Sequence, residues 1–145
     1  MNIRRVQAED FEPWHRLRLS LWPAASQPQD KQDMQDYLTN DTMAVFVAQA
    51  HDGCLVAFLE ANIRYYVDDC ATHNVGYVEG WYVDAAYRRQ GVGAALVKAA
   101  EDWARAKGCR EMASDCLLDN EVSLAAHLAL GYEEKSRLIH FAKSL

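Results

Sequence analysis

The chain has 145 residues, of which 50% are apolar and 25% are charged, a balance typical of one globular domain with its own core. Its formal net charge of −6, with no basic stripe, argues against nucleic acid as the main partner. No apolar run is long enough to span a membrane, and the N-terminus lacks the apolar core of a signal peptide, so we expect neither a membrane partner nor export.

The first third of the chain predicts one strand and two helices. Residues 2–6 predict a short strand, and Asp10 is the expected N-cap of a helix with one apolar side, formed by Phe11, Trp14, Leu17 and Leu21. Pro23 should end this helix. Two prolines and several small polar residues predict a loop over 23–31, followed by a short helix over 33–38.

The middle of the chain predicts a hairpin followed by a central strand. Two strand-like runs, 43–50 and 54–66, flank a turn at His51-Asp52-Gly53. A polar loop over 68–76 leads into a strand over 77–83. Gly80 lies inside that strand and is expected to form a β-bulge.

The last third predicts two more helices among three strands. Apolar residues at helical spacing indicate a helix over 89–107, ended by Gly108, with a strand over 110–115 after it. The remaining predicted elements are a helix over 121–130, capped by Asn120, and two final strands at 132–135 and 137–144.

The most informative motif is Arg88-Arg89-Gln90-Gly91-Val92-Gly93, between the strand over 77–83 and the helix that follows. A helix N-terminus carries unpaired N–H groups and the positive end of the helix dipole. Two glycines one residue apart allow a phosphate to approach the backbone. The motif is neither a dinucleotide-binding G-x-G-x-x-G nor a P-loop, because it lacks the third glycine and the Gly-Lys-Ser/Thr. A plain strand-to-helix turn is the simpler interpretation, which the flanking elements make less favourable.

The pattern Arg-x-x-Gly-x-Gly resembles the acetyl-CoA pyrophosphate loop of the GNAT superfamily of N-acetyltransferases, whose element order also matches the predicted order over the whole length. The resemblance implies an α/β GNAT fold over residues 1–145. Its mixed, mostly antiparallel sheet of about six to seven strands would be flanked by helices and splayed at the acetyl-CoA site. It also implies that the backbone N–H groups of Arg89, Gln90, Gly91, Val92, Gly93 and Ala94 hold the pyrophosphate. Val83 would pair with the pantetheine arm, while Arg88 and Arg89 add positive charge.

Further segments resemble the aminoglycoside 6′-N-acetyltransferases of the small, single-domain type found in Gram-negative bacteria. They are Leu17-Arg18-x-x-Leu21-Trp22-Pro23, Glu79-Gly80, Gly108 to Asp115, and His127-x-x-Leu130-Gly131-Tyr132-Glu133-Glu134. This resemblance implies acetyl transfer from acetyl-CoA to the 6′-amine of an aminoglycoside, hence antibiotic resistance, in a cytoplasmic homodimer. Cytoplasmic location fits the four cysteines, which form no Cys-x-x-Cys pair or zinc-spaced set and are expected to be reduced thiols without a metal. A disulfide stays open.

Two carboxylates are candidates for the base that exposes the lone pair of the acceptor amine. Glu79 lies in a strand of aromatic and apolar residues, where a carboxylate is unusual. The resemblance places an acid here as the base, or as the anchor of a water that relays the proton. Asp115 ends the next strand, and in the resembling family this acid contacts the substrate amine. The simpler roles are a salt bridge with an arginine for Glu79 and capping for Asp115. The sequence does not choose between the two as base.

His127 stands where many GNAT members carry the tyrosine that protonates the leaving thiolate. A histidine can supply that proton near neutral pH, but a packed histidine is an equal interpretation. The resemblance also places Trp22 and Tyr66 in the aminoglycoside pocket, where aromatic faces pack on sugars and attract cations. Packing in the core is the simpler interpretation of both, above all of Trp22. Asn120 would bond the pantetheine arm, although capping explains it equally well.

Two other functions keep part of this pattern. One is an acetyltransferase for a protein N-terminus, a lysine or a small polyamine. The other is a non-catalytic acyl-CoA-binding sensor, which would need the loop at Arg88–Gly93 but no carboxylate near the thioester. The presence of Glu79 and Asp115 argues against the sensor.

Overall fold

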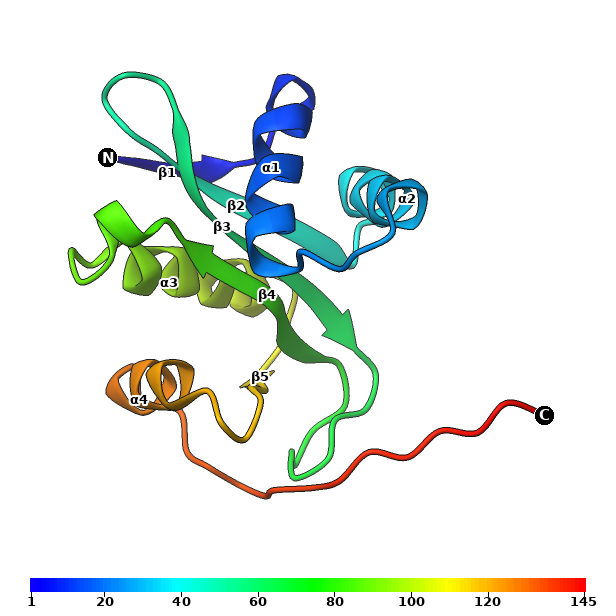
Figure 1. Cartoon of the computed structure of the whole chain (residues 1–145). Coiled ribbons are helices and arrows are strands. Elements are labelled where there is room, and N and C mark those ends of the chain that lie inside the picture. Colours follow the sequence, from blue (N-terminus) through cyan, green and yellow to red (C-terminus); the bar gives the residue numbers. More distant parts are fainter.

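The computed structural model describes residues 1–145 as a sheet with helices on both faces (Figure 1). Its strands are β1 (Asn2–Arg5), β2 (Met43–Gln49), β3 (Leu55–Arg64), β4 (Val75–Val83) and β5 (Met112–Ser114). Its helices are α1 (Phe11–Leu21), α2 (Gln27–Thr39), α3 (Val92–Ala106) and α4 (Glu121–Ala129), with 3₁₀ turns at Ala8–Asp10 and Ala85–Tyr87.

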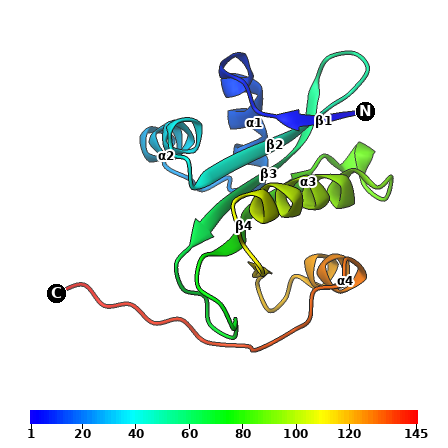
Figure 2. The ribbon, with the colours of Figure 1, turned by 180° about the vertical axis from the view of Figure 1, so that it is seen from behind.

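The sheet has five strands in the order β1-β2-β3-β4-β5. The first four pair antiparallel, and β5 runs parallel to β4. α1 and α2 cover one face and α3 covers the other, as the two opposite views show (Figures 1 and 2). Each face has its own apolar cluster. Trp14, Leu17, Met34 and Phe58 belong to the cluster between the sheet and helices α1 and α2, and Leu59, Leu96, Val97 and Ala100 belong to the cluster between the sheet and α3.

The second helix is longer than the sequence predicts. Residues 27–31 were expected in a loop, yet α2 begins at Gln27 and runs to Thr39. Pro28 lies in the first turn, where a helix tolerates proline because those N–H groups have no partner within the helix. Asp10 is the N-cap of α1 as predicted, but its side chain makes no capping hydrogen bond to the helix. Asp10 instead bonds the Arg4 guanidinium at 2.6 and 2.9 Å and the Gln7 N–H at 2.8 Å.

The predicted bulge in the central strand is confirmed. Glu60 of β3 pairs with Gly80, while the next residue, Ala61, pairs with Val78, so Glu79 is the extra residue. Val78 and Trp81 therefore both contact the α3-side cluster, and Gly80 faces the α1 side. A bulge re-aims side chains locally, which is a common device beside binding sites.

The two predicted C-terminal strands are wrong. Residues 132–145 form no helix or strand, and the chain leaves the body of the molecule in an extended path (Figures 1 and 2). The sheet therefore has five strands rather than six or seven. Within one chain these residues have no strand beside them to complete a ladder. The helices include no candidate for a membrane-spanning segment, by length and hydropathy together.

Candidate active site

The loop before α3 leaves a row of backbone donors unused. Gly91 is the N-cap of α3 with φ of 80°, a left-handed conformation that favours glycine, and Arg89 also has positive φ, at 60°. No backbone or side-chain acceptor within the chain pairs with any N–H group from Arg89 to Ala94. These donors point from a helix N-terminus, so the loop has the chemistry of an anion site.

The two arginines of the loop differ in the contacts that their side chains make. Arg88 donates from Nε to the carbonyl oxygen of Val83 at 2.8 Å, and its guanidinium lies 5.8 Å from the centre of the Tyr82 ring. Arg88 thus fastens the loop to the end of β4, whereas the Arg89 side chain is exposed and makes no hydrogen bond. Gln90 donates to the carbonyl oxygen of Ala86 at 2.9 Å.

Gly93 is required for packing rather than for a turn. A Cβ at this position would lie 2.9 Å from Cζ2 of Trp81, so α3 can approach β4 only because residue 93 has no side chain. Trp81 also meets His127 of α4 edge to face, with ring centres 5.4 Å apart. Its indole N–H is buried without a partner. Trp81 therefore joins the start of α3 to α4.

The sheet opens beside this tryptophan. β5 pairs with β4 only from Gly76 to Val78, so the half of β4 from Glu79 to Val83 has no strand on that side. A free strand edge exposes N–H and C=O groups that an extended ligand can bond. This is the splayed edge that the sequence placed next to the phosphate loop.

The two candidate carboxylates lie in one linked cluster. Arg64, at the end of β3, donates to Glu79 at 2.8 and 2.7 Å. The same guanidinium lies 3.6 Å from the centre of the Tyr77 ring, and the Tyr77 hydroxyl donates to Asp115. The simpler role foreseen for Glu79, an arginine salt bridge, is therefore present, whereas Asp115 is exposed beyond the end of β5.

Two members of the cluster, Tyr77 and Arg64, keep their protons because of their contacts. Burial and the hydrogen bond to Asp115 raise the pKa of Tyr77 well above its ordinary value, so its hydroxyl remains a donor. The hydrogen bond to Glu79 raises the pKa of Arg64. The sequence reasoning missed both residues. The available signal was the position of Arg64 at the polar end of a long apolar strand.

His127 has a protein partner at each ring nitrogen. Nδ1 lies 2.7 Å from the carbonyl oxygen of Ser123, and Nε2 lies 2.7 Å from the hydroxyl oxygen of Ser114. A carbonyl only accepts, so Nδ1 is the donor in the bond to Ser123, and the Ser114 hydroxyl is the partner of Nε2. Tyr132 packs on the ring from another side, with centres 5.7 Å apart. These contacts support the packed interpretation.

The three other predicted site residues lie in separate parts of the fold. The Asn120 side chain accepts from the Ser123 N–H at 3.0 Å, so the predicted N-cap is confirmed. Tyr66 is 62% exposed in the loop between β3 and β4. Trp22 is half-buried at the end of α1, and its ring occupies the space beside Gly80, where a Cβ would come within 2.4 Å.

Comparison with known proteins identifies the family. The model of the acetyltransferase (GNAT) family matches residues 11–132. The chain belongs to the GNAT acetyltransferase family. The five-stranded sheet, splayed between β4 and β5, is the GNAT fold in this chain.

Individual relatives show which members of the GNAT family this chain is similar to. Aminoglycoside N(6′)-acetyltransferase type 1 of Klebsiella aerogenes is 42% identical to it over 146 residues, which cover 99% of this chain and 96% of the relative. The solved structure of AAC(6′)-Iy with the bisubstrate analogue CoA-S-monomethyl-acetylneamine matches at a TM-score of 0.95 and 38% identity, covering 99% and 98% of the two chains. AAC(6′)-Iy in complex with CoA has the same TM-score and identity, with 99% and 95% coverage.

Proposed function

We propose that the chain transfers the acetyl group of acetyl-CoA to the 6′-amine of aminoglycosides and so confers resistance to them. The observation that carries this proposal is the adjacency of an unpaired N–H row, a free strand edge and two carboxylates at one opening of the sheet. It is supported by relatives named for this reaction and by a solved structure holding a CoA-aminoglycoside analogue.

Acetyl-CoA would bind along the opening. Its pyrophosphate would accept from the N–H groups of Arg89 to Ala94, with the free Arg89 side chain adding charge. The pantetheine arm would lie along the free half of β4 as far as Val83, and the amide nitrogen of Asn120, which no protein group uses, would bond it from the other side. In this arrangement the thioester would lie beside the carboxylate cluster.

We assign Asp115 as the base and Glu79 as the group that holds the cationic acceptor. Both oxygens of Glu79 already accept hydrogen bonds from Arg64, so this carboxylate is engaged within the protein. Asp115 is exposed and keeps an oxygen free, so it can reach a bulky amine. With both ring nitrogens of His127 occupied, the proposed source of the thiolate proton is solvent, and His127 positions α4.

The acceptor would lie between Trp22 and the loop that carries Tyr66. Asp68 and Asp69 beside Tyr66 are exposed carboxylates, which attract a polycation. The aromatic rings supply flat faces for the sugar rings.

A panel of amines with acetyl-CoA and a thiol-detecting reagent tests the assignment. Release of CoA thiol with 6′-amino aminoglycosides is the expected result, with gentamicin C1, whose 6′ nitrogen is methylated and hindered, a poorer substrate. Release only with peptides, lysine or small polyamines would favour the other acetyltransferase function. Binding of acetyl-CoA without thiol release from any amine would favour a sensor.

We also propose that the protein is a cytoplasmic homodimer of one domain over residues 1–145. The four cysteines are all unpaired, as expected in a reducing compartment.

Exposed large apolar side chains concentrate after β5, and those of the final segment include Leu138, Ile139 and Phe141, the last 85% exposed. A single copy leaves this surface in water, whereas a second copy would cover it. Light scattering of the full chain and of a chain ending at Gly131 tests this. A dimer that becomes monomeric on truncation is expected, and a monomeric full chain would contradict it.

A further inference from the structure

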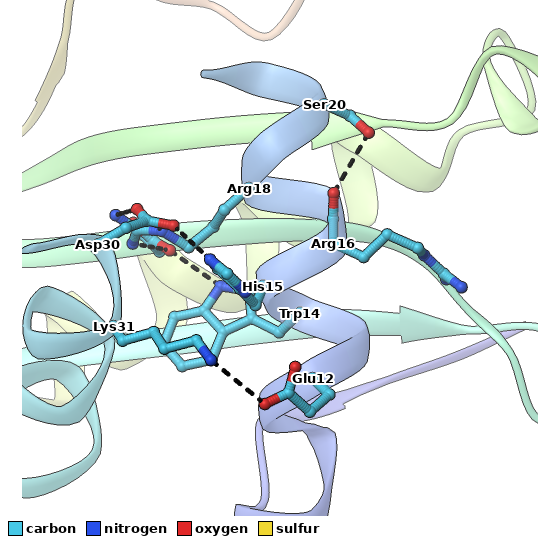
Figure 3. A network of polar contacts seen from close by, with 9 residues as sticks. Glu12, Trp14, His15, Arg16, Arg18, Ser20, Asp30 and Lys31 are labelled. Carbon is cyan, nitrogen blue, oxygen red and sulfur yellow. Dashed lines mark hydrogen bonds and ion pairs between the residues drawn. The ribbon is translucent and has the colours of Figure 1, made fainter. Parts of the chain in front are cut away.

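A buried polar cluster ties α1, α2 and β3 together on the face away from α3. Arg18 of α1 bonds Glu60 of β3 at 2.6 Å and Asp30 of α2 at 2.8 Å. Figure 3 shows the α1 and α2 members, with His15 Nε2 3.0 Å from the second Asp30 oxygen. Trp14 donates to Glu60 at 2.9 Å. Arg18, Asp30 and Glu60 are each no more than 5% exposed.

Burying charged groups costs desolvation free energy, so such a cluster contributes little net stability to a core. Burial raises the pKa of Glu60 to about 7 even though Arg18 and Trp14 oppose the rise. Apolar residues of similar volume commonly stabilise a core as well as, or better than, a buried ion pair. Stability alone therefore does not explain the cluster. The contacts of Arg18 with Trp22 indicate a further role.

Arg18 is attached to Trp22 by both backbone and side chain. The Trp22 N–H donates to the Arg18 carbonyl oxygen at 2.7 Å, and the guanidinium lies 4.9 Å from the centre of the Trp22 ring. On its other sides the ring meets Phe58 edge to face at 6.3 Å and covers Gly80. Gly80 is the register partner of Glu60 and follows Glu79 in the bulge. The Arg18 guanidinium thus contacts both Glu60, which pairs with Gly80, and the Trp22 ring, which covers Gly80.

We propose that Arg18 is a positioning residue of the acceptor site: anchored by Glu60 and Asp30, it holds the Trp22 ring against Gly80, beside Glu79. The planar guanidinium can bond both carboxylates and stack on an indole at once, which a lysine cannot do. The inference rests on the proposed function, because it assigns Trp22 to the acceptor pocket. Its consequence is that Arg18 affects acceptor binding and leaves acetyl-CoA binding unchanged.

Arg18→Lys is the decisive variant, because it keeps a buried cation for the two carboxylates and loses the planar stack. We expect the KM for the acceptor to rise by about 3- to 30-fold, as loss of a cation–π contact predicts, with kcat and the KM for acetyl-CoA within about twofold. In a Trp22→Ala background the same substitution should change the acceptor KM by less than about twofold. An equal effect in both backgrounds, or no effect in the first, would overturn the proposal.

Arg4→Lys is the matched control. Arg4 forms a similar two-bond contact with Asp10, at 2.6 and 2.9 Å, but has no contact with Trp22. It should lower the melting temperature and leave the acceptor KM unchanged. If Arg18→Lys does not fold, Glu60→Gln takes its place: it removes the charge that anchors Arg18 but keeps the side-chain shape, and a smaller rise in acceptor KM is expected.

A readout without turnover separates this inference from the proposed function. The indole N–H resonance of Trp22, assigned by Trp22→Phe, should shift and broaden in Arg18→Lys, while that of Trp103 on α3 stays in place. An unmoved Trp22 resonance would overturn the role of Arg18 whatever the enzyme acetylates. Absence of acetylation by the wild type, with the resonance shifted, would overturn the proposed function alone.

Discussion

At residue 91 both the backbone conformation and the proposed phosphate ligand favour glycine. Gly91 has φ of 80°, and a Cβ there would meet no atom within 4 Å, so the position is open but strained for any other residue. We expect Gly91→Asp to abolish acetyl-CoA binding in calorimetry, because it places a negative charge where the pyrophosphate approaches. Gly91→Ala isolates the strain. It should cost about 1–2 kcal/mol of stability and weaken binding less than about tenfold. Unchanged affinity in Gly91→Asp would remove the loop from the site.

The two carboxylates are separable by near-isosteric variants. Asp115→Asn should lower kcat by about 10²–10⁴-fold, the usual effect of removing a general base. Glu79→Gln should mainly raise the acceptor KM, because Glu79, already paired with Arg64, holds the substrate rather than its proton. Steady-state kinetics with one aminoglycoside decides. A kcat loss confined to Glu79→Gln reverses the assignment, and wild-type kinetics in both variants removes both residues from the mechanism.

At the scale of elements, α4 depends on His127 for its attachment to β5. The helix has no buried residue, and the ring bonds Ser114 of β5 as well as the carbonyl of Ser123 in its own helix. His127→Ala should therefore destabilise the protein by about 1–3 kcal/mol while kcat falls less than about tenfold. Thermal melts and a pH–rate profile check this. A 10²–10⁴-fold loss of kcat together with a lost limb of the profile would restore the proton-donor role.

The link between β1 and α1 gives a pH-dependent contribution to stability. The Arg4 hydrogen bonds lower the pKa of Asp10 below its ordinary value. The folded state then binds this proton less tightly than the unfolded state. The contribution is therefore complete above the unfolded pKa of about 4 and disappears as the pH falls through the folded value.

Asp10→Asn should thus lose about 1–3 kcal/mol of stability at pH 7, and its difference from the wild type should shrink below about pH 4. Denaturant titrations at several pH values measure this. Asp102→Asn, on an exposed pair with Lys98, is the control and should behave as the wild type throughout. A stability difference that stays constant down to pH 3 would contradict the argument.

Local sequence patterns predicted most of the helices and strands. They failed where the structure depends on contacts with residues distant in the sequence. The hairpin, the bulge at Gly80 and the helix after Gly91 follow from turn residues and periodicity within short segments. The C-terminal segment has a strand-like pattern, but a strand needs a neighbour, which one copy of the chain does not provide. In the proposed site, the loop at Arg88–Gly93 and both carboxylates come from the sequence and stay predictions. Arg64 and Tyr77 were not predicted, because their importance depends on contacts across the sheet that no spacing reveals.

At the scale of the whole molecule, the bulge, the parallel β5 and the loop before α3 combine to form one opening. The bulge re-aims Glu79, and the short β5 ends beside Asp115 while leaving half of β4 unpaired. The unpaired N–H row lies at the start of the helix that packs on Trp81, in the same part of the sheet. A thioester bound at that edge would therefore meet an amine held by the carboxylates, which is the arrangement that acetyl transfer requires.

The most direct test of this account is the structure of the product formed from kanamycin and acetyl-CoA. NMR and mass spectrometry of the purified product should show one added acetyl group, attached to the 6′ nitrogen. Acetylation at another amine would contradict the proposed orientation of the acceptor. No acetylation of any 6′-amino aminoglycoside, under conditions in which a peptide amine is acetylated, would contradict the proposed function itself.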